Sequence, residues 1–252
     1  MDRMLYTAMS GAKNSMDQQS IVSNNLSNVS TTGFRAQLQA ARSVPVQGEA
    51  LLATRTSAVT TTPGSDFSQG PVEYTGRTLD VAMQDDAWMA VQADDGTETY
   101  TRRGDLQIDA DGVLLNVGRP VMGEGGPIAI PQGAQVSIGA DGTISAIPEG
   151  VGPEALVEVG RIKLVTPEEG ALIRGEDGLF RAPPNEEGEP GALAADEDAK
   201  LVSGALEGSN VSAVDAMVSM IDVARRYDMQ MKVLSTADEN AQRANGILSI
   251  QG

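Results

Sequence analysis

The distribution of proline along the chain limits most strongly what this sequence can fold into. All 12 prolines lie between Pro45 and Pro190, and 24 of the 28 glycines lie within residues 43–208. Proline breaks helices and glycine disfavours them. The sequence therefore predicts long helices in the two terminal segments and none in the middle.

Both terminal segments have helical periodicity, with apolar or small residues at alternating steps of three and four. This seven-residue repeat packs one helix against another. Polar residues such as Ser15, Gln19 and Asp238 interrupt the repeat, so each seam is weak alone and suited to packing between many subunits. The expected subunit-packing seam of the N-terminal helix is Leu5, Ala8, Ala12, Val22, Leu26 and Val29, and that of the C-terminal helix is Met217, Met220, Ala224, Tyr227, Met231, Leu234, Ala241 and Leu248.

The middle of the chain reads as short strands, for example Trp88–Gln92 and Thr143–Ile147, separated by Asp-Gly turn signals. This pattern is typical of antiparallel hairpins. The predicted fold class is α+β, in which long N- and C-terminal helices form a coiled-coil domain beside a mainly antiparallel β central domain. We expect the terminal helices at 1–35 and 208–252, an extended linker at 36–76 and the β domain at 77–207.

The composition excludes several classes of protein. Cysteine and histidine are absent, which removes disulfides, thiolate sites, His-ligated metals and Ser-His-Asp triads. A formal charge of −17 argues against a nucleic-acid partner. No apolar run is long enough to span a membrane, so we expect no direct membrane insertion. The first residues also lack the pattern of a cleaved secretory signal.

No catalytic residues, metal site or cofactor are predicted. Adjacent carboxylates such as Asp85 and Asp86 point to opposite faces of an extended chain, so they do not make an acid–base pair. The run 107–118 partly matches a calcium loop but lacks acidic residues at the first and twelfth positions. The run 150–155 fits a loose dinucleotide fingerprint, but no helical pattern follows it.

Four motifs in order carry a family resemblance. The run 24–35, NNLSNVSTTGFR, resembles the N-terminal signature of the flagellar basal-body rod and hook proteins. The runs 79–91, 100–109 and 206–211 are similar to later signatures of that family, apart from Ala87, where the family usually has glycine. The motif residues are Asn24, Asn25, Leu26, Asn28, Thr32, Gly33 and Phe34 at the N-terminus, and Leu79, Asp80, Val81, Trp88, Tyr100, Thr101, Arg102 and Gly104 in the β domain. Gly33 lies in the chain reversal that ends the expected helical segment, and we expect a positive φ there.

The resemblance implies a structural, non-enzymatic subunit that assembles with copies of itself in a helical rod. It also implies other proximal and distal rod proteins and the flagellar type III export apparatus as partners. The expected location is the periplasmic span of the flagellar basal body, reached without a cleaved signal peptide. The sequence is most similar to proximal-rod members of the family. A distal-rod member is the alternative, and a secreted binding module is a weaker one.

Overall fold

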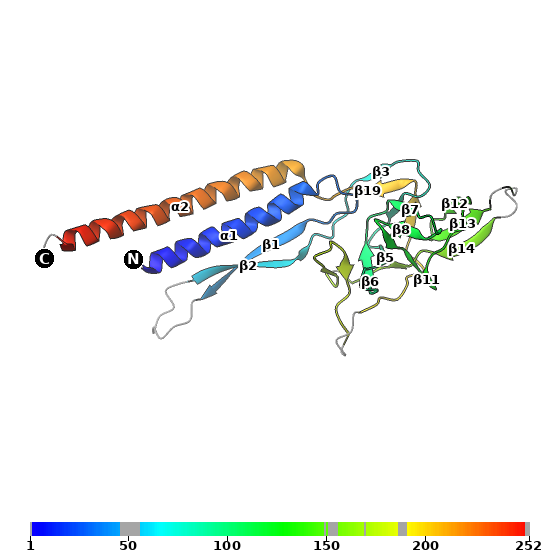
Figure 1. Ribbon diagram of the computed structural model, residues 1–252, viewed down its shortest axis with the longest axis horizontal. Helices are drawn as coiled ribbons and strands as arrows, with labels where there is room; N and C mark the ends of the chain where they lie inside the picture. The colour runs from blue at the N-terminus through cyan, green and yellow to red at the C-terminus, as the bar shows by residue number, and fades with distance from the viewer. Residues whose placement is uncertain are drawn as a thin grey trace. The chain divides into compact units, whose positions relative to one another are not determined.

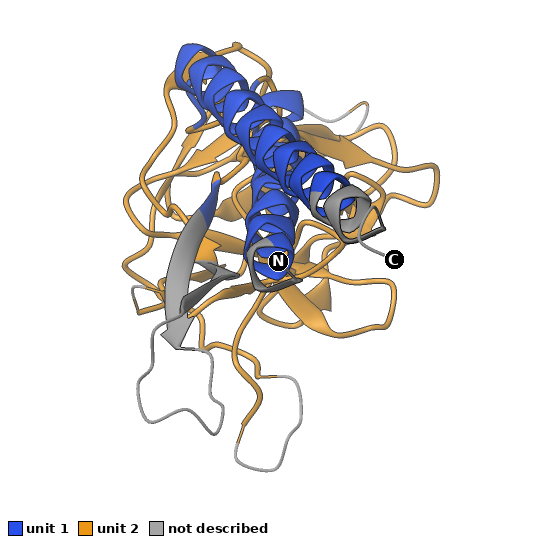
Figure 2. Cartoon of the chain, turned by 90° about the vertical axis from the view of Figure 1, so that its left-hand side faces the viewer, with its two compact units in different colours: residues 1–29, 37–63, 211–252 blue, residues 30–36, 64–210 orange. Residues whose placement is uncertain are grey.

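The computed structural model is α+β, as the sequence predicted, with two helices and many antiparallel strands (Figure 1). It describes residues 2–45, 56–148, 150, 156–168, 170–185 and 191–249. The chain divides into two compact units, which are coloured separately in Figure 2. Unit 1 comprises residues 1–29, 37–63 and 211–252, and unit 2 comprises residues 30–36 and 64–210.

Unit 1 is built around two long helices, α1 (Asp2–Ser27) and α2 (Ala213–Ser249). They lie side by side and run in opposite directions (Figure 1). The strands β1 (Gln37–Pro45) and β2 (Thr56–Ser65) pair as a two-stranded sheet. The segment 36–76, expected as an extended linker, is therefore paired along part of its length, because its Thr and Val residues favour strands.

The helix boundaries differ from the expected ones mainly at the N-terminal end. The helix expected over 1–35 ends at Ser27, where the amide of Asn28 bonds to the carbonyls of both Asn24 and Asn25. At the other end, the Ser212 hydroxyl accepts a hydrogen bond from the Asp215 amide at 3.3 Å. Ser212 thereby caps α2 at its first turn, as a serine or threonine commonly does.

Unit 2 contains the remaining strands, most of them short. Its largest sheet has five strands in the order β15-β5-β6-β17-β16, and its other sheets have two or three strands. Every strand pair with a defined register is antiparallel. The strands are β3 (Val72–Tyr74), β4 (Val81–Met83), β5 (Trp88–Gln92), β6 (Glu98–Thr101), β7 (Leu106–Ile108), β8 (Leu114–Asn116), β9 (Arg119–Pro120), β10 (Met122–Gly123), β11 (Gly126–Pro127), β12 (Gln135–Ile138), β13 (Thr143–Ile147), β14 (Val157–Arg161), β15 (Leu164–Val165), β16 (Ile173–Arg174), β17 (Phe180–Arg181), β18 (Leu201–Ser203) and β19 (Ala205–Glu207).

The core of unit 2 has two parts. The larger is aliphatic and includes Val81, Met89, Leu106 and Ile144, all essentially inaccessible to solvent. The smaller is aromatic, with Trp88, Tyr100 and Phe180 packed among aliphatic neighbours. Aliphatic and aromatic burial of this kind supplies most of the stabilisation of a β domain, at roughly 25 cal/mol per Å² of apolar surface. Unit 2 therefore has the core of an independently folding domain.

Candidate functional site

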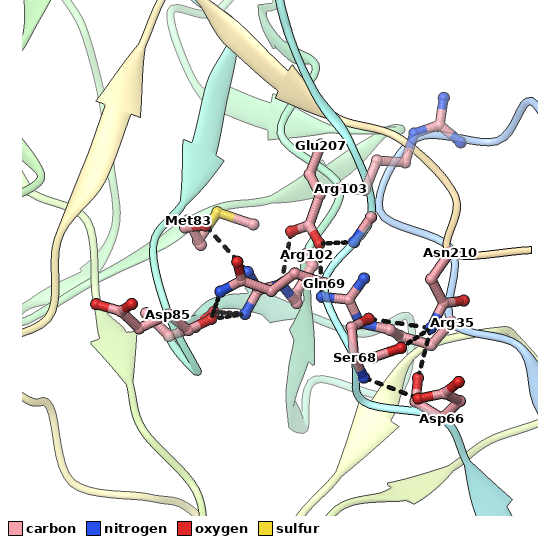
Figure 3. Close-up of polar contacts among 12 residues, drawn as sticks. Arg35, Asp66, Ser68, Gln69, Met83, Asp85, Arg102, Arg103, Glu207 and Asn210 are labelled. Carbon is pink, nitrogen blue, oxygen red and sulfur yellow. Dashed lines mark hydrogen bonds and ion pairs between the residues drawn. The ribbon is translucent and has the colours of Figure 1, made fainter.

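Residues from all four sequence motifs meet in unit 2, around one buried group of charges (Figure 3). We call the side chains of Arg35, Trp88, Arg102 and Glu207 the junction cluster. Arg35 comes from the first motif, Trp88 and Arg102 from the two central ones, and Glu207 from the last. Motifs that are far apart in the sequence thus share one place in the fold.

Glu207 is the centre of the cluster. Its Oε1 lies 2.7 Å from Arg35 Nη2, and its Oε2 lies 2.7 Å from Arg102 Nε. The Oε1 atom also accepts a hydrogen bond from the Gly70 amide at 2.9 Å. The three charged side chains are at most 2% exposed. One buried carboxylate therefore neutralises one of two buried cations, and the triad carries a net charge of +1.

Arg102 is fully engaged by backbone carbonyl groups as well as by Glu207. Its Nη1 donates to the carbonyls of Asp85 at 2.6 Å and Ala87 at 2.9 Å, and its Nη2 donates to that of Met83 at 3.0 Å. These bonds tie the turn between β4 and β5 to the end of β6. The planar guanidinium suits such a site because its donors have fixed directions.

Arg35 is held mainly by charge and by packing. Its Nη2 forms the ion pair with Glu207, whereas its Nε and Nη1 have no hydrogen-bond partner among the described residues. Burial lowers the pKa of Arg35, and the charge of Glu207 opposes that shift. The Trp88 ring centroid lies 6.0 Å from Arg35 Cζ and 5.8 Å from Arg102 Cζ, a distance at which the ring face attracts cations.

Residues 30–36, which we call the strap, follow α1 and lie within unit 2. The Gly33 amide donates to the Glu207 carbonyl at 2.7 Å. Phe34 is buried, and the Arg174 guanidinium carbon lies 4.5 Å from its ring centroid. Arg174 Nη1 also donates to the Arg35 carbonyl at 3.0 Å. The strap is thus fixed by backbone, aromatic and ionic contacts at successive residues.

Asn210 joins the strap to two other segments. Its Oδ1 accepts a hydrogen bond from the Ala36 amide at 2.8 Å, and its Nδ2 donates to the carbonyls of Asp66 and Ser68 at 2.9 and 3.0 Å. Its own amide donates to the Phe34 carbonyl at 3.3 Å. The chain enters or leaves unit 2 after residues 29, 36, 63 and 210. One asparagine therefore bonds to two segments that continue into unit 1, the strap and the chain after residue 63, and itself lies at the end of a third.

The residues expected in the N-helix seam have a common environment in unit 1. Ala12 is buried and the others are partly buried, whereas Tyr6, Met9 and Met16 on the same helix are more than half exposed. Near the end of α1, Asn25 exchanges two hydrogen bonds with the backbone of Gln37, at 2.9 and 3.1 Å. This motif residue ties the helix to β1, whereas Thr32, in the strap, donates to Asp105 at 3.4 Å in unit 2.

The residues expected in the C-helix seam divide between two faces of α2. Met220, Tyr227, Leu234 and Ala241 are partly buried, on the same stripe as Ala216, Val223, Gln230 and Ala237. Met217, Ala224 and Met231 are exposed on the neighbouring stripe. The side chain of Leu248 lies outside the described part of the chain. Within one chain, the inward stripe of α2 is therefore displaced by one residue from the expected seam at three positions.

The β-domain motif residues hold the core together. Val81 is inaccessible, and its amide donates to the Gly104 carbonyl at 3.0 Å. A Cβ at Gly104 would overlap the Val81 carbonyl, so this close approach requires glycine. Asp80 accepts hydrogen bonds from Thr75 at 2.7 Å and Arg77 at 2.9 Å. Leu79 packs against the aliphatic core.

Tyr100 anchors the chain that returns after residue 190. Its hydroxyl donates to Glu98 Oε1 at 2.7 Å and accepts a hydrogen bond from the Leu193 amide at 2.7 Å. Burial is the main cause that raises the pKa of Tyr100 well above its usual range. The next residue, Thr101, accepts a hydrogen bond from the Arg103 amide at 3.1 Å. Both motif residues therefore have structural partners.

Ala87 replaces a glycine that the family usually has, and the structure accommodates it. Positive φ among described residues other than glycine occurs only at Asp85 and Val117, so Ala87 does not need the left-handed conformation. The Ala87 amide donates a hydrogen bond to the Gln84 carbonyl at 3.0 Å, and the Ala87 carbonyl accepts a hydrogen bond from Arg102 Nη1. The turn before Trp88 therefore forms with an alanine.

Sequence reasoning singled out Arg102 and Trp88 but did not assign roles to Arg35, Glu207 or Asn210. Each of these three residues lies within a family motif, and two are charged residues beside buried neighbours. The first and last motifs each contain a single charged residue, Arg35 and Glu207, and that charge was the available signal. Its meaning depends on contacts between distant segments, which periodicity does not reveal.

No group of three or more potential metal ligands gathers among the residues that the structure describes. The partial calcium-loop match is a turn in which Asp109 Oδ1 accepts hydrogen bonds from the amides of Asp111 and Val113, at 2.9 and 2.8 Å. The carboxylate thereby closes the turn itself. Of the 150–155 fingerprint, only Gly150 lies within the described residues.

Three family models match the chain in the order of its elements. Residues 5–35 match "Flagella basal body rod protein", residues 82–146 match "Flagellar hook protein FlgE/F/G D1 domain", and residues 202–247 match "Flagellar basal body rod FlgEFG protein C-terminal". The first and last matches include most of α1 and most of α2, and the central one includes β5 and β6. Helical ends around this β unit define the class of flagellar axial structural proteins.

Curated relatives give a finer assignment. The chain is 51% identical over 251 residues to the flagellar basal-body rod proteins FlgF of Salmonella typhimurium and Escherichia coli, covering 99% of this chain and 100% of each relative. It is 32% identical over 266 residues to FlgG of Bacillus subtilis, covering 95% and 97% of the two chains. The chain belongs to the FlgF family of flagellar basal-body rod proteins.

Membership of this family establishes the function of the chain. It is a structural subunit of the flagellar rod, and the family is not enzymatic. It assembles with other basal-body rod components. Over the described residues, neither helix combines the length and the apolar character that a membrane span requires.

Proposed function

We propose that the chain polymerises in the proximal part of the rod through the exposed apolar faces of unit 1. In this proposal α1 and α2 form a coiled-coil inner domain that surrounds the export channel, and unit 2 forms the outer layer. Copies of the chain and other rod proteins are its partners, and the rod transmits torque from motor to hook. We also propose delivery by the flagellar type III export apparatus to the periplasmic span of the basal body.

The outward stripe of α2 is the observation that carries this proposal. We define it as Val214, Met217, Ile221, Ala224 and Met231, which follow heptad spacing interrupted at one position by the exposed Asp228. Val214 is 71% exposed, and Met217 and Ile221 are each 53% exposed. A second heptad stripe beside the inward one is the pattern of a helix that packs on two sides. Three of its residues, Met217, Ala224 and Met231, belong to the subunit-packing seam expected from the sequence.

The charge of the chain is distributed in a way that favours this arrangement. The segments of unit 1 contain eight basic and eight acidic residues, so the whole formal charge of −17 lies in unit 2. Like charges repel at subunit contacts, and a neutral surface avoids that cost when identical units are stacked. The neutral helical unit is therefore the better polymerising surface, and the acidic unit is better suited to facing solvent.

The family resemblance implies that FlgF is the proximal-rod protein and FlgG the distal-rod protein, and on that basis the relatives support proximal over distal placement. Identity to the two FlgF relatives is 51%, against 32% to a FlgG relative of similar coverage. A distal position remains the second candidate, because FlgG relatives also align over 95% of the chain. Imaging of basal bodies in which this chain carries a tag reports its axial level and separates the two positions.

Ile221→Asp is expected to abolish rod incorporation and motility while the monomer keeps its fold. The new carboxylate lies on the outward stripe, so it is solvated in the monomer and is buried without a partner only when subunits pack. The measurements are the amount of the chain in purified basal bodies and swimming in soft agar. Circular dichroism of the purified monomer reports its helix content.

Ser219→Asp is the matched control, since Ser219 is exposed on α2 but is not part of the outward stripe. It is expected to leave incorporation unchanged. Met220→Asp places the same charge on the inward stripe and is expected to reduce the helix content of the monomer as well. Normal motility of the Ile221→Asp variant would exclude the outward stripe as a subunit contact.

A further inference from the structure

We propose that Gln230 of α2, seated against Gly11 and Ser15 of α1, fixes the stagger at which the two helices pair. This inference concerns the register within one chain. It goes beyond the proposed function, because it says what decides which residues of α1 and α2 lie side by side on the polymerising surface.

Gln230 is an exception in the stripe where it lies. The inward stripe of α2 otherwise consists of Ala213, Ala216, Met220, Val223, Tyr227, Leu234, Ala237 and Ala241. A glutamine at such a position reduces the apolar contact between helices. Single polar residues at seam positions are a known way to specify register at a cost in stability.

The partners of Gln230 on α1 are complementary to it in shape and in chemistry. The Ser15 hydroxyl donates a hydrogen bond to Gln230 Oε1 at 3.2 Å, and Ser15 is 5% exposed. A Cβ added to Gly11 would lie 2.8 Å from Gln230 Nε2 and 3.1 Å from its Cδ. The space that a larger residue would fill at position 11 is thus occupied by the carboxamide. Glycine disfavours helix interiors, and this contact gives Gly11 a reason to be there.

Slipping the helices by one heptad removes both partners. The residues seven positions from Gly11 are Met4 and Gln18, whose side chains would require the space of the carboxamide. The residues seven positions from Ser15 are Ala8 and Val22, which have no side-chain hydrogen-bonding group. Either slip would also bury part of the Gln230 carboxamide without its partner, which is costly. The observed stagger is the one at which α1 offers a glycine and a serine together.

The other contacts between α1 and α2 define the stagger poorly, so an additional specific contact is needed. Alanine occupies several inward positions of both helices, and alanine pairs at one register resemble alanine pairs at the next. Apolar packing alone therefore discriminates poorly between staggers. The polar contact of Gln230 requires a glycine and a serine at matching positions of α1. It therefore favours one stagger over the others.

Spin labels test the stagger directly, because the chain has no cysteine of its own. The labelling sites are Asp17→Cys in α1 and Asn240→Cys in α2, since Asp17 and Asn240 are both exposed on their helices. Pulsed electron paramagnetic resonance on the full-length, doubly labelled monomer is expected to give one narrow distance. Gln230→Leu and Gly11→Ala are each expected to add a second population, displaced by up to about 10 Å, since seven helical residues rise about 1.5 Å each.

Thermal unfolding of unit 1, followed by circular dichroism, distinguishes a register lock from ordinary packing. Gln230→Leu is expected to keep or raise the unfolding midpoint while the distance distribution broadens. Gln242→Leu is the matched control, because Gln242 is exposed on α2 and its side chain, among the described residues, bonds within its own helix to Asp238. It is expected to keep the single distance.

Three results would overturn the proposal. They are a single unchanged distance in Gln230→Leu, a lowered midpoint in Gln230→Leu with no second population, and a broad distribution in the unsubstituted monomer. None of these measurements uses rod incorporation. A failure here is therefore distinguishable from a failure of the outward stripe of α2 as a subunit contact.

Discussion

Glu207→Gln is expected to lower the free energy of unfolding of unit 2 by about 3–5 kcal/mol, the usual range when one partner of a buried ion pair is removed. Glutamine has almost the shape of glutamate, so packing is retained. The charge is lost, and both Arg35 and Arg102 are left as buried cations without an anion. Urea unfolding measures the loss. The fluorescence of Trp88 is a suitable probe, because it is the only tryptophan and its ring centroid lies 6.0 and 5.8 Å from the guanidinium carbons of Arg35 and Arg102.

Two further variants isolate the cause. Glu73→Gln makes the same change at an exposed residue of β3 opposite Leu206 of β19, and it is expected to change stability by less than about 0.5 kcal/mol. Arg35→Met leaves the neutral Arg102–Glu207 pair and removes a guanidinium whose Nε and Nη1 have no hydrogen-bond partner among the described residues. It is expected to cost less than Glu207→Gln. A cost for Arg35→Met equal to or larger than that for Glu207→Gln would contradict the electrostatic account.

The helical ends and the β centre were predictable because they depend on local chemistry. Proline and glycine are confined to the middle, and each of the four Asp-Gly signals became a turn whose glycine has positive φ, at Gly96, Gly112, Gly142 and Gly178. The end of α1 was placed too late. Its helical spacing runs on to Val29, but α1 ends at Ser27, and residues 30–36 follow their tertiary partners in unit 2.

The inward face of α2 illustrates a limit of periodicity. Two stripes one residue apart both have apolar members at heptad spacing, for example Val223 on one and Ala224 on the other. The sequence does not say which of them faces α1. The structure shows which stripe contacts α1. The residues of the outward stripe are left available for contact with another subunit.

The junction cluster could not be predicted from the sequence, for a related reason. Arg35, Arg102 and Glu207 stand in three different motifs, and a charged residue in a loop is ordinarily solvated. Only the fold shows that Glu207 bonds to the other two with no exposure to water. The motifs were recognised as family signatures, and in this chain their residues converge on one buried cluster.

Gly33→Val is expected to displace the strap and to abolish motility. The expectation that Gly33 has positive φ is confirmed, at +66°. A β-branched residue in this region costs about 1–2 kcal/mol from its backbone conformation alone. In addition, a Cβ at Gly33 would lie 2.5 Å from the Arg102 carbonyl oxygen and the Arg103 nitrogen, which are backbone atoms that cannot rotate away. The strap must then move, and the hydrogen bond from the Gly33 amide to the Glu207 carbonyl breaks.

The loss should be visible in the purified chain before any assembly. Displacing the strap removes Arg35 from Trp88 and lets water reach the ring, so the emission of Gly33→Val is expected to shift to the red and its urea midpoint to fall. Swimming in soft agar and recovery of the variant in basal bodies report the effect in cells.

Gly76→Val separates backbone strain from the close approach. Gly76 has a similar φ of +72°, yet a Cβ there would meet no atom within 4 Å. This variant therefore has the conformational cost without the clash, and it is expected to lose only about 1–2 kcal/mol and to keep the emission of Trp88. If the two valine variants lost equal stability and kept the same emission, positive φ alone would explain the requirement for glycine. The strap would then not depend on the contact between Gly33 and the backbone of Arg102.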